Sequence, residues 1–184
     1  MVHDTAQAVA ARWISAAAAE RGHDREVLDL FARFVAEHTD CCERHCAPGH
    51  LTGSAWLVSA DGRRVLLTHH RKLNLWLQLG GHADGDGHLD RVALREAEEE
   101  SGLSGLTIEG GIYDLDRHWI PERKGEPGHW HYDVRFVVRA GASEDFVVGE
   151  ESLDLAWRAI DEVARDDSAD ASVRRMATKW MARM

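Results

Sequence analysis

The stretch that most constrains the fold is a glycine-rich loop that runs directly into an acidic helical segment. The loop reads GGHADGDG over residues 80–87, and LDRVALREAEEES follows it at residues 89–101. An alternating apolar run, LNLWLQL at residues 73–79, stands before the loop and favours a strand. We therefore predict a strand, a loop and a helix of about three turns. Gly102 is expected to end the helix as its C-cap.

The rest of the chain adds helices at both ends and short strands between them. Residues up to about 40 favour two helices that are separated at Gly22. Short apolar runs then predict strands, and SVRRMATKWMARM predicts a closing amphipathic helix. The expected strands cover residues 51–59, 64–70, 73–79, 105–120, 129–140 and 153–160. This order predicts an α/β domain from about residue 50 to 165.

Composition excludes several classes of protein. The formal charge of −10 disfavours nucleic-acid binding, because a phosphate backbone needs a basic surface. No apolar run of about 18 residues is present, so no membrane span is expected. The three cysteines, Cys41, Cys42 and Cys46, are too few and too crowded for a disulfide framework, which favours a cytoplasmic location.

The acidic segment places three carboxylates on one side of the predicted helix. At 100° per residue, Glu96, Glu99 and Glu100 share an arc of about 100°, whereas Glu98 lies on the opposite, solvated side. Like charges at this spacing repel one another. A hard divalent cation such as Mg²⁺ offsets the repulsion and prefers oxygen ligands. Arg95 is placed to hold one of the carboxylates through a bidentate pair.

The stretch from Gly81 to Leu103 resembles the box motif of the Nudix hydrolase family. The final block of the box is matched at the correct spacing by Arg95, Glu96, Ala97, Glu99, Glu100, Gly102 and Leu103. One position departs from the motif, because Gly87 stands where the family has its first glutamate. We expect a nearby aspartate, Asp84, Asp86 or Asp90, to replace that glutamate. The departure suggests a divergent subgroup with a GGHADGD-type loop.

The resemblance implies an α/β/α sandwich with a mixed sheet. Residues 1–48 would form a helical segment packed on the domain, and residues 49–184 would form the Nudix-like domain with its C-terminal helix. The N-terminal helices would either cover the domain or form a homodimer contact.

The implied activity is hydrolysis of a pyrophosphate bond in a nucleoside diphosphate linked to another moiety. Glu96, Glu99, Glu100 and the Gly80 carbonyl would bind Mg²⁺ or Mn²⁺, and Arg95 would orient the glutamates. Glu96 and Glu99 are candidate general bases, as are Glu150 and Glu151 in a later loop. The partner is therefore a small nucleotide-type substrate.

Histidines form a second candidate group. In HWHYDVRF, His129 and His131 fall on one strand face with Asp133 and Arg135, and the aromatic residues fall on the other. One hypothesis places His82, His129 and His131 in the active site, in contact with phosphate or a metal. The other makes them polar residues on a solvent-facing side of a strand.

Three further alternatives remain at this point. Cys42, His45, Cys46 and His50 could form a zinc site, although their spacing fits no common pattern and incidental thiols are favoured. An isopentenyl-diphosphate-isomerase-like enzyme is less favoured, because that family uses a cysteine in the loop before its box. A non-catalytic nucleotide sensor on the same fold is disfavoured, because all three metal-binding glutamates are retained.

Overall fold

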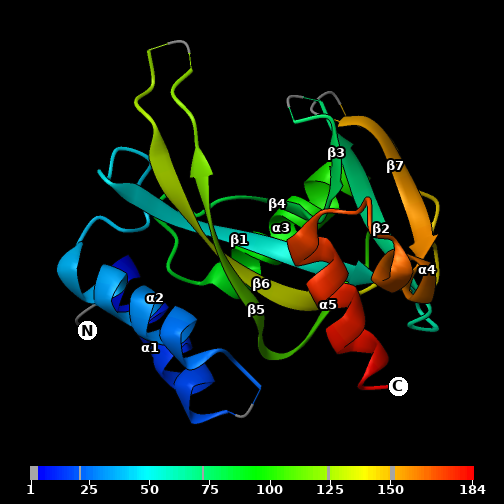
Figure 1. The fold of residues 1–184 in the computed structure, drawn as a ribbon, viewed down its shortest axis with the longest axis horizontal. Coiled ribbons are helices and arrows are strands. Elements are labelled where there is room, and N and C mark those ends of the chain that lie inside the picture. The colour runs from blue at the N-terminus through cyan, green and yellow to red at the C-terminus, as the bar shows by residue number, and fades with distance from the viewer. Residues whose placement is uncertain (1–3, 21, 72, 124, 150–151) are drawn as a thin grey trace. The chain divides into compact units, whose positions relative to one another are not determined.

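The computed structural model describes residues 4–20, 22–71, 73–123, 125–149 and 152–184 (Figure 1). Its helices are α1 (Ala6–Ala19), α2 (Arg25–Glu37), α3 (Leu89–Ser101), α4 (Ile160–Arg165) and α5 (Ala171–Met181). Its strands are β1 (Gly49–Val58), β2 (Arg64–His70), β3 (Leu75–Leu77), β4 (Leu79–His82), β5 (Thr107–Ile120), β6 (His129–Arg139) and β7 (Ser152–Ala159). The predicted helices and all but one of the predicted strands are confirmed to within a few residues.

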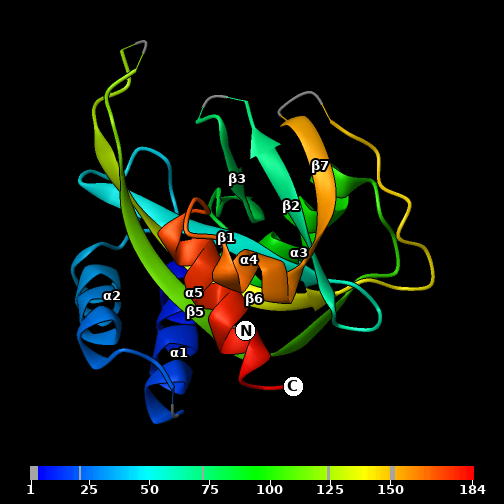
Figure 2. The ribbon, with the colours of Figure 1, turned by 45° about the vertical axis from the view of Figure 1, so that its right-hand side comes forward.

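The strands pair in the order β3-β2-β1-β6-β5, with β4 paired to β1 and β7 paired to β2. Strand β2 pairs antiparallel with β1, β3 and β7, and its Thr68 lies opposite Leu77 of β3 and Leu155 of β7 (Figure 2). One prediction is wrong here, because residues 73–79 do not form a single strand. Leu75–Leu77 pairs with β2, and Leu79–His82 pairs with β1. The chain changes its pairing partner at Gln78, which an alternating pattern does not reveal.

Two compact units divide the chain. The first contains residues up to Gly53 together with Gly81–Val92 and Gly110–Phe136. In it, α1 and α2 lie side by side and pack on aromatic residues of β6. The Phe34 ring stacks on Tyr132 at a centroid distance of 3.7 Å, and Trp13 meets Phe136 edge-on at 5.1 Å. The aromatic side of β6 is therefore buried at Tyr132 and Phe136.

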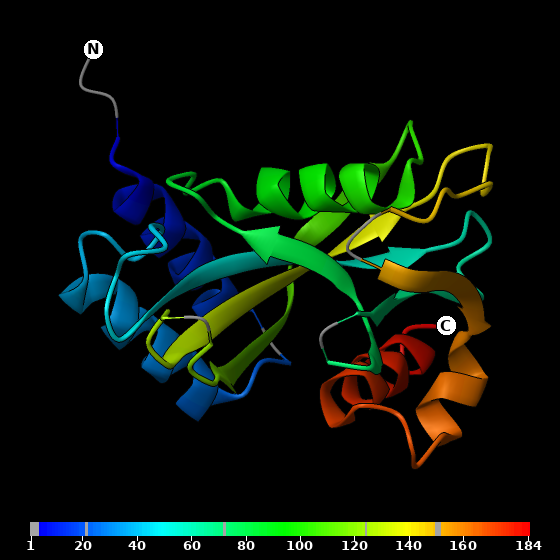
Figure 3. The ribbon, with the colours of Figure 1, turned by 90° about the horizontal axis from the view of Figure 1, so that it is seen from above.

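The second unit contains Ser54–Gly80, Ala93–Glu109 and residues from Val137 to the C-terminus. Its core joins buried side chains of β1, β2, β7 and α3, among them Leu57, Leu66, Ala97 and Leu155. Helices α4 and α5 lie against each other beside the end of β7 (Figure 3). The sequence pattern did not predict helix α4. The indole N–H of Trp180 donates to the Gly62 carbonyl at 2.8 Å and fixes α5.

None of the helices within the described residues is both long and apolar enough to cross a membrane. The predicted boundary between residues 48 and 49 and the predicted homodimer contact stay predictions.

Candidate active site and histidine cluster

Helix α3 has the limits that the sequence predicts, and local hydrogen bonds fix both ends. At the start, Asp86 Oδ1 accepts a hydrogen bond from the His88 backbone N–H at 2.8 Å. At the end, Gly102 adopts a positive φ of 67° and donates its N–H to the Glu98 carbonyl at 2.8 Å. Glycine suits this position because other residues are strained in the left-handed region. The helix buries an apolar face of Leu89, Val92, Ala93 and Ala97.

Because that face is buried, the glutamates of α3 differ in their exposure to solvent. Glu96 and Glu100 are half-buried, whereas Glu98 and Glu99 are exposed. The prediction that Glu98 is solvated is therefore confirmed, and Glu99 is also open to solvent. An exposed carboxylate keeps its oxygens available to a bound ion or a water molecule.

Two contacts position the half-buried carboxylates. Arg95 Nη2 donates to Glu96 Oε1 at 3.1 Å, so this arginine holds a carboxylate, and its bidentate geometry stays a prediction. Glu100 Oε1 accepts a hydrogen bond from the Gly80 N–H at 3.1 Å, which ties α3 to strand β4. A Cβ at Gly80 would lie 2.1 Å from Ser54 Oγ, so only glycine lets β4 approach β1 this closely.

The donor set of this region suits a hard divalent cation. Carboxylate and carbonyl oxygens are the ligands that Mg²⁺ and Mn²⁺ prefer. Two groups of described residues have potential ligand atoms that all lie within 4.8 Å of one another, and neither contains Glu96, Glu99 and Glu100 together. The three carboxylates share the predicted region of α3 and Gly80 lies beside Glu100, but their oxygens are not gathered at one point.

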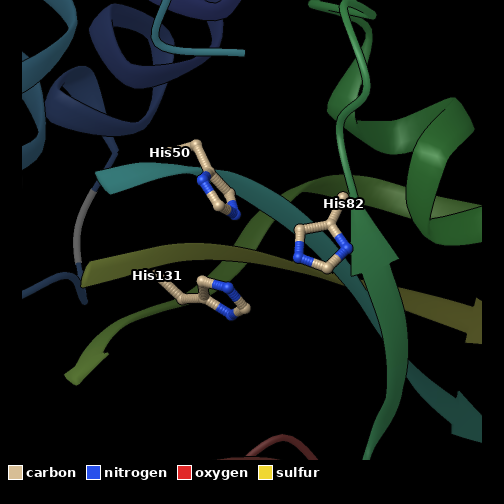
Figure 4. A group of neighbouring side chains, drawn as sticks. All are labelled: His50, His82 and His131. Atoms are coloured by element: carbon tan, nitrogen blue, oxygen red, sulfur yellow. The ribbon is translucent and has the colours of Figure 1, made fainter. Parts of the chain in front are cut away.

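A cluster of histidines lies in the first unit. His50 of β1, His82 of β4 and His131 of β6 turn their rings toward one another (Figure 4). The ring centroids of His50 lie 5.0 Å from those of His82 and 4.8 Å from those of His131. His129 joins the edge of the cluster, with its Nε2 atom 3.3 Å from His131 Nε2. The structure thus brings together the three histidines that the sequence analysis proposes, and it adds His50.

Close backbone contacts of β1 create this cluster. The Trp130 N–H donates to the Pro48 carbonyl at 2.9 Å, and the Ala83 N–H donates to the Leu51 carbonyl at 3.2 Å. A Cβ at Gly49 would lie 2.2 Å from the Trp130 carbonyl oxygen, so glycine permits this approach of β1 to β6. His50 was not among the predicted site residues, because its partners are set by strand pairing rather than by a local pattern.

Burial keeps these imidazoles neutral. Desolvation, with smaller repulsion from neighbouring histidines, lowers the pKa of His50 to about 4 and the pKa of His131 to about 2. Desolvation also lowers the pKa of His82. Neutral imidazole is the form that binds transition metals.

Beyond the histidines, the polar face of β6 is buried rather than exposed to solvent. Asp133 and Arg135 are both 1% exposed. Arg135 Nε donates to Asp133 Oδ2 at 2.7 Å and Nη1 donates to Asp114 Oδ2 at 3.2 Å, while Thr52 Oγ1 donates to Asp133 Oδ1 at 2.8 Å. The polar side of β6 is therefore buried at Asp133 and Arg135.

The cysteine loop does not form the zinc set considered from sequence. Cys46 groups with His38 and Asp40, whereas His50 groups with His82 and His131. Cys41, Cys42 and Cys46 are buried free thiols, and burial together with the contact to Asp40 raises the pKa of Cys46 to about 12. A thiol with a raised pKa is a poor nucleophile, which agrees with a structural role.

The chain matches a known protein family over most of its length. Residues 50–180 match the NUDIX domain family, and this range includes both α3 and the histidine cluster. The chain belongs to the Nudix family. The glutamates of α3, with Arg95 and Gly102, lie within the matched range.

A Mycobacterium tuberculosis protein that is named as a candidate 8-oxo-dGTP diphosphatase is 32% identical to this Nudix chain over 111 residues. The match covers 56% of the chain and 48% of that protein. The chain thus spans about half the length of the curated relatives it matches.

Solved structures show the Nudix fold. A Caenorhabditis elegans Ap4A hydrolase is 18% identical with a TM-score of 0.56, and the match covers 72% of this chain and 95% of that one. A NUDIX-family hydrolase from Clostridium perfringens is 24% identical with a TM-score of 0.54, covering 72% and 96%. The fold is the predicted α/β/α sandwich with a mixed sheet, with N-terminal helices before it.

The departure from the Nudix box at Gly87 has a structural reason. A Cβ at this position would lie 2.1 Å from the Ala6 carbonyl oxygen, at the start of α1. A glutamate side chain therefore has no room here while α1 keeps its place. Of the nearby aspartates, Asp86 caps the turn before α3, and Asp84 forms a bidentate pair with Arg44 at 2.5 and 2.8 Å.

The later-loop candidates for the general base, Glu150 and Glu151, lie outside the described residues.

Proposed function

We propose that this Nudix chain is a Mg²⁺- or Mn²⁺-dependent hydrolase that cleaves a pyrophosphate bond in a nucleoside diphosphate linked to another moiety. The observation that carries the proposal is the presence on α3 of all three glutamates of the final block of the box, two of which are held by specific contacts. Arg95 holds Glu96, and the Gly80 N–H holds Glu100. Three carboxylates on neighbouring turns of one helix repel one another unless a cation offsets their charge, which favours a metal-dependent function.

Each residue has a separate role in the proposed reaction. Glu96, Glu99, Glu100 and the Gly80 carbonyl would hold the ion, and Arg95 would keep the Glu96 carboxylate in its bound orientation. A bound Mg²⁺ or Mn²⁺ neutralises phosphate oxygens and lowers the pKa of a water molecule. Glu99 is exposed and is our first choice for the base that takes a proton from the attacking water, with Glu96 as the second.

Substrate contacts are assigned to His82, His129 and His131. The rings of His82 and His129 both contact that of His131 in one cluster, and the substrate would approach this cluster as a group. We also assign the chain to a divergent subgroup, on the basis of its GGHADGD loop and the contact between Gly87 and α1.

The test is a substrate panel with Mg²⁺ or Mn²⁺, repeated with Glu99→Gln. The panel includes ADP-ribose, nucleoside diphosphate sugars and, because relatives are named for them, 8-oxo-dGTP and Ap4A. We expect release of a phosphate-containing product from at least one compound and a loss of about 100-fold or more in kcat/KM for Glu99→Gln. Circular dichroism and the melting temperature confirm that the variant is folded.

Failure of the proposal has distinct forms. Tight binding of a nucleotide with no turnover of any compound would support a sensor instead. Isomerisation of isopentenyl diphosphate, added to the same panel, would support the isomerase-like alternative. Equal kcat/KM for the wild type and Glu99→Gln would remove Glu99 from the chemistry and contradict its role as ligand and base.

A further inference from the structure

We propose that His50, His82 and His131 form a binding site for one zinc-class transition-metal ion, separate in its chemistry from the oxygen-donor site of the box. The three residues come from β1, β4 and β6 (Figure 4). Metal binding by this cluster would be a property of the folded chain and would not depend on the proposed hydrolase function.

The ring nitrogens of the three histidines lie close enough together to approach one ion. One ring nitrogen from each histidine lies within 4.8 Å of the others. In a tetrahedral zinc site with Zn–N bonds of about 2.0–2.1 Å, ligand nitrogens lie roughly 3.4 Å apart. The three rings already face a common point, so metal binding would need the nitrogens to move closer together by side-chain rotation (Figure 4).

The second argument is the state of His50. This residue is 3% exposed, and neither its Nδ1 nor its Nε2 atom has a hydrogen-bond partner among the residues that the structure describes. Buried side-chain nitrogens in folded proteins nearly always have a partner. An ion bound by one nitrogen satisfies part of this requirement and explains why an imidazole, rather than an apolar side chain, occupies the position.

Hydrogen bonding selects the ligand atom of His131. His129 Nδ1 lies 2.9 Å from the Pro127 carbonyl, which only accepts, so Nδ1 carries the proton. With His129 neutral, its Nε2 atom accepts from His131 Nε2–H at 3.3 Å. His131 Nδ1 then bears the free lone pair. His129 is thus a positioning residue that fixes the tautomer of a ligand, a common role around metal-bound histidines.

The chemistry of the site selects the class of ion. Imidazole nitrogens suit Zn²⁺, Cu²⁺ and Ni²⁺, whereas Mg²⁺ prefers oxygen. Each of the three imidazoles can offer a ring nitrogen to the ion, and these nitrogens lie within 4.8 Å of one another. Three protein ligands leave a fourth position open, where an anionic oxygen of a ligand can bind.

The experiment measures zinc binding to the whole chain without substrate or Mg²⁺. Chelator-treated protein is equilibrated with Zn²⁺, and bound zinc is counted by mass spectrometry and by competition with a fluorescent chelator. We expect one tightly bound ion per chain, a rise in melting temperature, and a weakening of about 100-fold or more in His50→Gln and His131→Gln. Histidine nitrogen shifts in NMR spectra should report coordination through His131 Nδ1.

Three matched variants exclude other sites. His69→Ala removes a histidine of β2 that stacks on Trp76, outside the cluster, and should leave zinc binding unchanged. Cys46→Ser tests the group of His38, Asp40 and Cys46, and Glu99→Gln tests the box. Loss of zinc from either of these two variants, retention of zinc by a folded His131→Gln, or absence of bound zinc in the wild type would overturn the proposal.

Discussion

At the scale of single residues, Gly87 shows how a contact far along the chain changes a motif. The position that carries a glutamate in the family box lies against the Ala6 carbonyl at the start of α1. The motif alone shows that the glutamate is missing, but it does not show that a helix takes its space. This helix belongs to the segment before the matched family range.

Gly87→Ala should therefore lower stability. The added Cβ overlaps a backbone oxygen, which cannot move as a flexible side chain can, and we expect a loss of about 1–3 kcal/mol in unfolding free energy. Gly149→Ala is the control, because its nearest neighbour lies at 3.9 Å. Urea denaturation of both variants measures the difference. Equal stability of the two variants would show that α1 does not pack on Gly87.

Glu109 should contribute a specific acid sensitivity. Hydrogen bonds from Arg139, including one from Nη2 at 3.0 Å, lower the pKa of this carboxyl. A carboxyl whose pKa is lower in the folded state stabilises the fold above its unfolded pKa, and the contribution is lost as pH falls through the folded value. Between roughly pH 5 and pH 3, the wild type should lose more unfolding free energy than Glu109→Gln. Parallel pH profiles for the two proteins would contradict this assignment.

At the scale of elements, strand β6 has an aromatic side and a polar side, and both are buried. Its aromatic side packs on α1 and α2 through Tyr132 and Phe136, and its polar side buries Asp133 and Arg135. The alternation of HWHYDVRF predicts which residues share a face, but not that both faces are covered. Opposite charges in contact make the buried polar face tolerable.

Phe34→Ala tests the attachment of α2 to this strand. Phe34 is buried and stacked on Tyr132 with an angle of 5° between the rings. Its removal leaves a cavity, for which we expect a loss of about 3–5 kcal/mol in unfolding free energy. The neighbouring exposed residue offers a control, since Arg33→Ala should change stability by less than about 0.5 kcal/mol. Thermal and denaturant unfolding of both variants give the comparison.

At the scale of the whole molecule, the formal charge of −10 repels any phosphate substrate unless positive charge is present at the site. Anionic substrates approach such a chain favourably only where cations or local dipoles offset the repulsion. Divalent cations bound by the acidic face of α3 would offset this repulsion. The proposed function depends on their binding.

Local features of the chain were predictable from the sequence, and long-range ones were not. Helix α3, its end at Gly102 and the exposure of Glu98 follow from spacing and turn chemistry within a few residues. The position of His50 beside His82 and His131 depends on the pairing of β1 with β4 and β6. Residues 73–79 show the same limit, since the change of pairing partner at Gln78 leaves the apolar alternation intact.

The most direct test of the account is the location of a divalent cation on α3. Crystals of the protein soaked in manganese salt should show anomalous density for Mn²⁺ bound by carboxylate oxygens of Glu96, Glu99 and Glu100, and Glu99→Gln crystals should show it weakened. Glutamate side chains that extend into solvent around an empty site, at Mn²⁺ concentrations that support hydrolysis, would contradict the account.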